Sequence, residues 1–152
     1  GLFHDMWGFP SNNPKVVNEL MRHLIDKIEN NVHAITRYKE HCMEDAEYVF
    51  ISYGSSARSA IHLAQTRRNR GEKIGVLELQ SIWPFPAELV REKCERAKAV
   101  LVVEMNMGQV MAQVKAVVKK PNRVFLANRF DGHLITPSDI KKLLRVLQGR
   151  GV

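Results

Sequence analysis

Two short polar stretches combine a glycine with side chains that can hold an anion. The first is Gly54-Ser55-Ser56, which follows an apolar run and precedes a helical pattern. The second is Asn106-Met107-Gly108-Gln109, which has the same position in a later part of the chain. A glycine-containing turn at the start of a helix presents unpaired backbone N–H groups together with the positive end of the helix dipole. Both turns are therefore candidates to bind a phosphate or another anion.

The same residues also have a purely structural interpretation. Ser55 or Ser56 can accept hydrogen bonds from the first N–H groups of the helix that follows, and such caps are common at helix starts. The charged residues nearest to the two turns are Arg58 and Glu104, which would flank a crevice between them. The sequence leaves open whether the turns bind a ligand or only cap helices.

Catalytic and nucleotide-binding motifs are absent from the sequence. It has no GxGxxG, no GxxxxGK[ST] and no GxSxG pattern, and no histidine is placed to activate Ser55 or Ser56. His4-Asp5 has no third ligand nearby, and Cys42 and Cys94 are isolated, which excludes a disulfide framework and a CxxC ligand set. We therefore expect no metal, a reducing cytoplasm as the environment, and a module that binds or docks while its chemistry is supplied elsewhere.

Composition favours a soluble globular chain with one good core. Apolar residues make up 45% of the sequence and charged residues 26%, and no run approaches the ~18 apolar residues of a membrane span. The first residue is glycine rather than methionine, so we expect a piece of a longer polypeptide.

The net charge of +7 raises the question of a nucleic-acid surface. The basic residues are scattered, however, except in the stretches 67–70 and 141–150, and no exposed aromatic residues are interleaved with them. This pattern favours a solvated charged face over nucleic-acid binding.

The elements that must position the two turns alternate regularly along the chain. Apolar runs predict strands that begin near Tyr48, Ile74, Ala99 and Arg123, with a helical pattern between each pair. Such alternation predicts parallel strands joined by right-handed crossovers, in an open sheet with helices on both sides. Ligands of such sheets bind at the carboxyl ends of the strands. If the first and third of these strands are neighbours, the two polar turns face each other.

The first part of the chain has a different pattern. An irregular lead-in precedes Asn13-Pro14, which predicts the start of an amphipathic helix that ends near Asn30-Asn31. Tyr38 to Met43 is a candidate edge strand. We therefore predict a junction and connector helix over residues 1–36 and an α/β domain over residues 37–152.

Three stretches, in this order, resemble the α-subunit of 2-oxoacid:ferredoxin oxidoreductases, most closely the 2-oxoglutarate type. They are Ala46 to Arg58, Trp83-Pro84-Phe85-Pro86 and Val103 to Gln109. The lead-in, Gly1 to Asp5 with Gly8 and Pro10, also resembles the junction that follows the first domain of that subunit. The resemblance spans nearly the whole chain.

The resemblance implies a fold. The chain would be the second domain of the α-subunit, similar to the transketolase carboxy-terminal domain. That domain is a three-layer α/β/α sandwich on a five-stranded, mostly parallel sheet of order 1-3-2-4-5, whose first strand is antiparallel. Tyr38 to Met43 would then be the first strand, and the strands at Tyr48 and Ala99 would be neighbours.

The resemblance also implies a function for the whole enzyme. Enzymes of this family oxidatively decarboxylate a 2-oxoacid, form the acyl-CoA and pass electrons to ferredoxin, with thiamine diphosphate, Mg and iron–sulfur clusters as cofactors. Thiamine is held by the first α domain and the β-subunit, which are the expected partners, so this chain alone should be inactive and hold neither catalytic nor cofactor-binding residues. The signature turns, as ligand or interface sites, comprise Gly54, Ser55, Ser56, Arg58, Glu104, Asn106, Gly108 and Gln109. The alternative is a free-standing module that binds phosphate or CoA.

Overall fold

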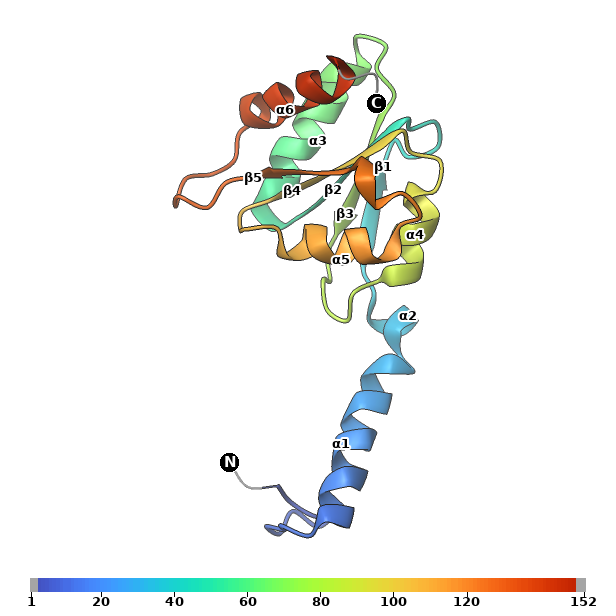
Figure 1. Cartoon of the computed structure of the whole chain (residues 1–152), viewed down its shortest axis with the longest axis vertical. Helices are drawn as coiled ribbons and strands as arrows, with labels where there is room; N and C mark the ends of the chain where they lie inside the picture. The colour runs from blue at the N-terminus through green and yellow to red at the C-terminus, as the bar shows by residue number, and fades with distance from the viewer. Residues whose placement is uncertain (1–2, 150–152) are drawn as a thin grey trace. The chain divides into compact units, whose positions relative to one another are not determined.

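The computed structural model describes residues 3–149 (Figure 1). The chain divides into two units, with the boundary between Ile35 and Thr36. The first unit contains helix α1 (Pro14–Glu29) and a short helix α2 (Val32–Ile35), which the sequence pattern did not predict. Helix α1 begins at the predicted residue, because the Asn13 side chain accepts a hydrogen bond of 3.0 Å from the backbone N–H of Lys15.

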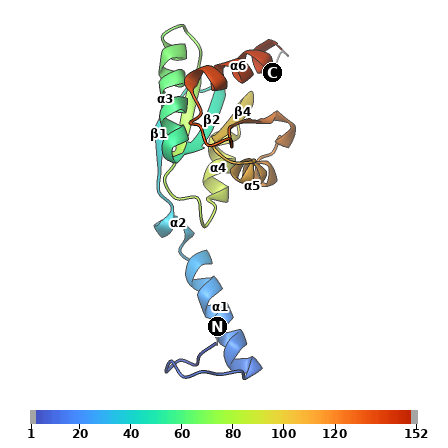
Figure 2. The same ribbon diagram turned by 90° about the vertical axis from the view of Figure 1, so that its left-hand side faces the viewer.

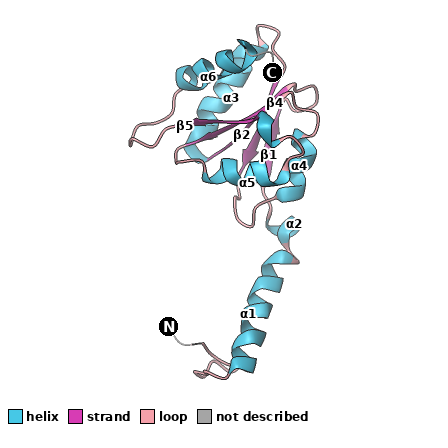
Figure 3. Cartoon of the chain, viewed as in Figure 1, coloured by secondary structure: helices cyan, strands magenta, loops and turns pink. Residues whose placement is uncertain are grey.

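The second unit is built on a five-stranded sheet of order β1-β3-β2-β4-β5 (Figure 3). Strands β2 to β5 are parallel, and β1 is antiparallel to β3, with Tyr38 opposite Leu79. This is the predicted topology, and the predicted edge strand is β1. The strands are β1 (Tyr38–His41), β2 (Tyr48–Tyr53), β3 (Ile74–Leu79), β4 (Ala99–Glu104) and β5 (Val124–Asn128).

Helices cover both faces of the sheet, which confirms the predicted three-layer sandwich (Figures 1 and 2). Helices α3 (Gly54–Arg68) and α6 (Pro137–Gly149) pack on one face. Helices α4 (Ala87–Cys94) and α5 (Gln109–Val117) pack on the other, and a 3-10 turn over Pro121–Arg123 precedes β5.

Alternating side chains of the inner strands build a core on each side of the sheet. Phe50 and Leu101 belong to the core under α3 and α6, whereas Ile51 and Val102 belong to the core over α4 and α5. Every residue of β4 is buried, as expected for a central parallel strand covered on both faces. A buried Val, Leu, Ile or Phe side chain stabilises the fold by about 1.5–3 kcal/mol relative to an exposed one.

Several ion pairs form at the amino ends of the parallel strands. Arg67 pairs with Glu72, and Arg68 pairs with Asp45 at 2.6 Å, so part of the basic stretch 67–70 is engaged within the chain. No helix of the described residues is long and apolar enough to cross a membrane.

Candidate functional site

The two polar turns lie side by side at the carboxyl ends of neighbouring strands. Strands β2 and β4 are adjacent and parallel, with Ser52 opposite Val103, so the turns that follow them reach the same edge of the sheet. The Ser55 hydroxyl contacts the Met105 sulfur across the two turns, at 3.5 Å. We call this edge the carboxyl rim.

The first turn differs from the capping prediction. Strand β2 runs to Tyr53 and α3 begins at Gly54, whose φ is +57°, so Ser55 and Ser56 lie inside the first helical turn rather than before it. The residue at the N-cap position is Tyr53, and its side chain makes no capping hydrogen bond. Of the two interpretations that the sequence left open for this turn, capping of the helix by Ser55 or Ser56 is therefore wrong.

The serine hydroxyls instead join β2, α3 and β4. The Ser56 hydroxyl donates to the Tyr53 carbonyl at 2.7 Å and lies 3.2 Å from the Val103 carbonyl oxygen. The Ser52 hydroxyl donates to the same Val103 carbonyl at 2.7 Å and lies 3.0 Å from the Ser56 oxygen. Both serines are buried, so these bonds satisfy polar groups that burial would otherwise leave unpaired.

The second turn is organised by a buried carboxylate. Glu104, the last residue of β4, is fully buried, and its two carboxylate oxygens accept hydrogen bonds of 3.1 Å from the backbone N–H groups of Val110 and Met111. The Tyr53 hydroxyl donates to the same carboxylate at 3.4 Å. A negative charge at this position is stabilised by the positive end of the α5 dipole.

Asn106 completes the second turn. Its side-chain oxygen accepts hydrogen bonds from the backbone N–H groups of Gly108 at 2.8 Å and Gln109 at 3.1 Å, and its amide nitrogen donates to the Tyr53 hydroxyl. Together with Glu104, it satisfies the backbone N–H groups of residues 108–111. The anion position at the start of α5 is thus filled by the protein's own side chains, and in this turn they cap the helix.

Not every part of the predicted site is present. Glu104 and Arg58 do not flank an open crevice as predicted, because Glu104 is fully buried while Arg58 is exposed on α3. Gly108 has a φ of +100°, a conformation that favours glycine, and allows the chain to turn into α5. Gln109 is exposed.

Sequence reasoning missed two members of this network. The Asn128 side chain, at the end of β5, donates to the Asn106 carbonyl at 2.8 Å. The Tyr53 hydroxyl lies between Glu104 and Asn106, and burial, together with the nearby Glu104 charge, raises the pKa of this phenol. Tyr53 could have been predicted as a site residue from its position directly before the turn glycine, Gly54.

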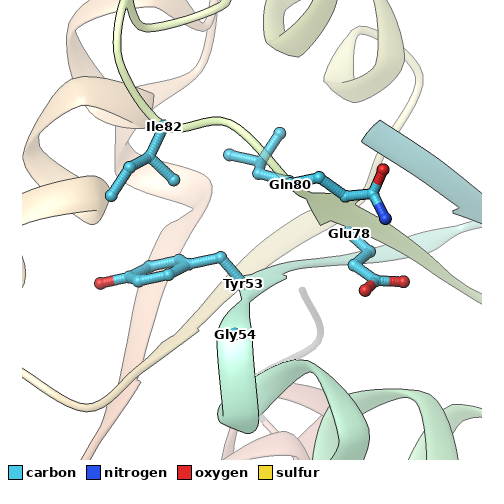
Figure 4. Close-up of a pocket in the computed structure, with 6 residues that line it drawn as sticks. Tyr53, Gly54, Glu78, Gln80 and Ile82 are labelled. Atoms are coloured by element: carbon cyan, nitrogen blue, oxygen red, sulfur yellow. The ribbon is translucent and has the colours of Figure 1, made fainter. Parts of the chain in front are cut away.

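A pocket of about 370 Å³ opens beside Gly54, between the ends of β2 and β3 (Figure 4). Figure 4 shows the Tyr53 ring and Ile82 on one side of the pocket and the polar ends of Glu78 and Gln80 on the other. The Glu78 carboxylate contacts the His41 ring nitrogen at 2.9 Å. The sequence analysis singled out Gly54 among the residues that line this pocket, but not Gln80 and Ile82, which come from an irregular loop.

The sheet order and the helical layers define a transketolase-like α/β domain. A split-gene transketolase has a similar fold, with a TM-score of 0.57 and 20% identity over 74% of this chain and 40% of that chain. Residues 46–140 match the family described as pyruvate:ferredoxin oxidoreductase core domain II. The chain belongs to this family, which confirms the resemblance to the second domain of the α-subunit.

Individual relatives agree with this assignment. The 2-oxoglutarate synthase subunit KorA of Methanocaldococcus jannaschii is 34% identical over 93% of this chain and 38% of its own length. The ketoisovalerate oxidoreductase subunit VorB of Methanothermobacter marburgensis is 38% identical over 74% of this chain and 32% of its own length. The chain therefore spans less than two fifths of the length of these relatives.

A solved structure shares the fold over almost the whole chain. The 2-oxoglutarate:ferredoxin oxidoreductase from Magnetococcus marinus has a TM-score of 0.79 and 22% identity, and the match covers 96% of this chain and 26% of that chain.

The side chains of the described residues do not fit the cofactors that the resemblance implies. No group of three or more His, Cys, Asp or Glu residues between residues 3 and 149 is placed to hold a metal ion. The N–H groups at the start of α5, which could bind a diphosphate, already bond to Glu104 and Asn106. Burial raises the pKa of Cys94 to about 12, which disfavours the thiolate that an iron–sulfur cluster needs.

Proposed function

We propose that this chain is the second domain of the α-subunit of a cytoplasmic 2-oxoacid:ferredoxin oxidoreductase that acts on 2-oxoglutarate. The complete enzyme would oxidatively decarboxylate the 2-oxoacid, form the acyl-CoA and reduce ferredoxin. Support comes from the family match and from the similarity to a 2-oxoglutarate synthase subunit over 93% of this chain.

Within that enzyme, the role proposed for this domain is assembly and support of the active site rather than catalysis. The observation that carries this proposal is the buried Glu104 carboxylate, which accepts hydrogen bonds from Val110 and Met111. The donors that a ligand would use at this turn hold β4 and α5 together instead. A rim whose polar groups are bonded to one another suits a domain that supports its neighbours.

The proposed partners are a preceding thiamine-binding domain of the same subunit and a β-subunit. They would supply the binding sites for thiamine diphosphate and Mg, with iron–sulfur clusters elsewhere in the complex. The engaged amides of α5 support this division of roles.

Reduction of a viologen dye by 2-oxoglutarate and CoA tests the proposal. The complete enzyme should turn over, whereas this chain alone should reduce no dye under the same conditions. Pyruvate and 2-oxoisovalerate, assayed in parallel, test the substrate. Dye reduction by the 152-residue chain alone would contradict the proposed role.

A second candidate function is binding of phosphate or CoA at the first turn. It is favoured by one observation: α3 begins at Gly54 without a side-chain cap, and the pocket of about 370 Å³ opens there. Calorimetric titration with CoA and with phosphate tests it, using Ser55→Asp to add negative charge and Ser55→Ala as the control. Binding that Ser55→Asp abolishes and Ser55→Ala retains would support this function, and absence of heat with both ligands would contradict it.

A further inference from the structure

Exposed apolar side chains gather on the carboxyl rim. In the described part of the second unit, the large exposed apolar side chains are Tyr38, Ile82, Trp83, Met107, Phe130, Leu134 and Val146. Five of them, Ile82, Trp83, Met107, Phe130 and Leu134, lie in the loops that follow β3, β4 and β5. Tyr38 is at the same rim, because it begins β1 and pairs with Leu79, the last residue of β3. Val146 lies on α6, away from the rim. Figure 1 shows the loops after β4 and β5 on the same side of the unit. Scattered apolar side chains are normal on a surface, but a set along one rim indicates an interaction site.

Three side chains of the rim are exposed over most of their surface. Trp83 is 69% exposed, Met107 is 74% exposed and Leu134 is 66% exposed. Tryptophan and methionine are enriched at protein interfaces, and burial of a leucine side chain removes further apolar surface from water.

The opposite rim has a different character. At the amino ends of the strands, Glu47 pairs with Lys73 at 3.5 Å and with Lys98 at 2.6 Å, and Lys119 pairs with Glu95. By contrast, residues 80–86 and 105–108, which follow β3 and β4, include no charged residue. The loop after β5 is mixed, because Arg129 pairs there with Asp131 at 2.8 Å beside the exposed Phe130. The amino rim is thus suited to water, whereas the uncharged loops after β3 and β4 make the carboxyl rim suited to a partner.

The polypeptide also enters the second unit at the carboxyl rim. The Arg37 carbonyl, directly before β1, accepts hydrogen bonds from the backbone N–H groups of Gln80 at 2.9 Å and Ser81 at 3.0 Å. Whatever precedes this point in the chain is tethered to the apolar rim. A tether raises the effective concentration of a covalently linked partner above that of a free one.

We propose that the carboxyl rim, formed by Tyr38, Ile82, Trp83, Met107, Phe130 and Leu134, docks on an apolar surface of the preceding domain of the same subunit. This inference rests on the proposed function, which makes this chain the second domain of a longer polypeptide. The relatives leave ample length for such a domain, since this chain covers 38% of the KorA subunit of Methanocaldococcus jannaschii. The amino rim then faces solvent.

Hydroxyl-radical footprinting tests the docking directly. Oxidation of Trp83 and Met107 is measured by mass spectrometry in this chain and in the complete α-subunit expressed without other subunits. We expect the oxidation of both residues to be largely lost in the complete α-subunit. Acetylation of Lys73 and Lys120 at the amino rim is the control, and it should be equal in the two samples.

Three results would overturn the inference. Equal oxidation of Trp83 and Met107 in both samples would mean that the rim stays exposed. Protection that appears only after the β-subunit is added would assign the rim to another chain. Protection in this chain alone that disappears on dilution would assign it to a second copy.

Variants distinguish an effect on docking of the rim from an effect on the stability of the fold. Trp83→Gln with Met107→Gln should leave the melting temperature of this chain unchanged, because both side chains are exposed, and should restore oxidation of Phe130 in the complete α-subunit. Val146→Gln, an exposed apolar position away from the rim, should leave Phe130 protected. Footprinting needs no turnover, so a protected rim in an enzyme inactive with all 2-oxoacids would contradict the proposed function but not the docking.

Discussion

Glu104 and Val110 are joined by a 3.1 Å hydrogen bond that fixes a fully buried carboxylate at the first turn of α5. A buried carboxylate is costly unless its oxygens are hydrogen-bonded, and here Met111 and Tyr53 supply further donors. The chain thus places a carboxylate from its own β4 at a helix start, a position that can bind an anion.

Replacing Glu104 by glutamine should destabilise the fold. The amide keeps the shape of the carboxylate but places an NH₂ group where one oxygen now accepts a backbone N–H, and it removes the charge that faces the α5 dipole. We expect the free energy of unfolding in urea to fall by about 1–3 kcal/mol. Glu44→Gln, at an exposed position, is the matched control and should leave it unchanged. Equal stability of the two variants would contradict the role assigned to Glu104.

Asn106→Ala should weaken the start of α5. The substitution leaves the backbone N–H groups of Gly108 and Gln109 without their acceptor and should cost about 0.5–2 kcal/mol. Amide hydrogen exchange of both residues should speed up in the same variant. Asn122→Ala, at an exposed asparagine before β5, serves as the control and should change neither quantity.

Gly75→Ala should destabilise the contact of β3 with the segment between β1 and β2 by overpacking. An added Cβ would lie 2.7 Å from the Met43 sulfur and 2.8 Å from the Ala46 Cβ, closer than atoms of a packed core tolerate. The expected loss is about 1–3 kcal/mol in urea unfolding. Gly149→Ala adds the same methyl group with no atom within 4 Å, so it should cause no loss. A Gly75→Ala variant as stable as the wild type would show that this packing is loose.

Cys94 should make stability depend on alkaline pH. Burial raises the pKa of this thiol to about 12 from an ordinary value of 9.0, so the folded state keeps its proton where the unfolded chain ionises. The stabilisation is complete below pH 9 and is lost as the pH rises towards 12. By about pH 10.5 the wild type should have lost about 2 kcal/mol more than Cys94→Ala. Parallel stability curves for the two proteins would contradict this.

Most of the fold could be predicted from local patterns. Strands β2, β3 and β4 begin at the predicted residues Tyr48, Ile74 and Ala99, because runs of buried apolar residues between helical patterns leave little choice. The antiparallel direction of β1 came only from the family resemblance, since four mostly exposed residues carry no directional signal. Helix α2 was missed because a single turn of helix has no measurable period.

The site was less predictable than the fold. Sequence order placed the two turns at one rim, but it could not show that Glu104 would point back into the start of α5, since that depends on a contact across six residues. It also placed the serines before α3 instead of inside it, because the boundary between β2 and α3 is set by strand pairing and not by a local cap. The contact of Asn128 depends on the pairing of β5 with β4, which no local pattern reveals.

In its proposed role, this domain supports the enzyme without contributing a reactive group. The most direct test is kcat for 2-oxoglutarate-dependent viologen reduction by the complete enzyme carrying Ser55→Ala or Gln109→Ala, the exposed polar residues of the two turns. We predict kcat within about twofold of the wild type, at an unchanged melting temperature. A loss of about a hundredfold or more in kcat without loss of stability, the effect of removing a catalytic acid or base, would contradict the claim.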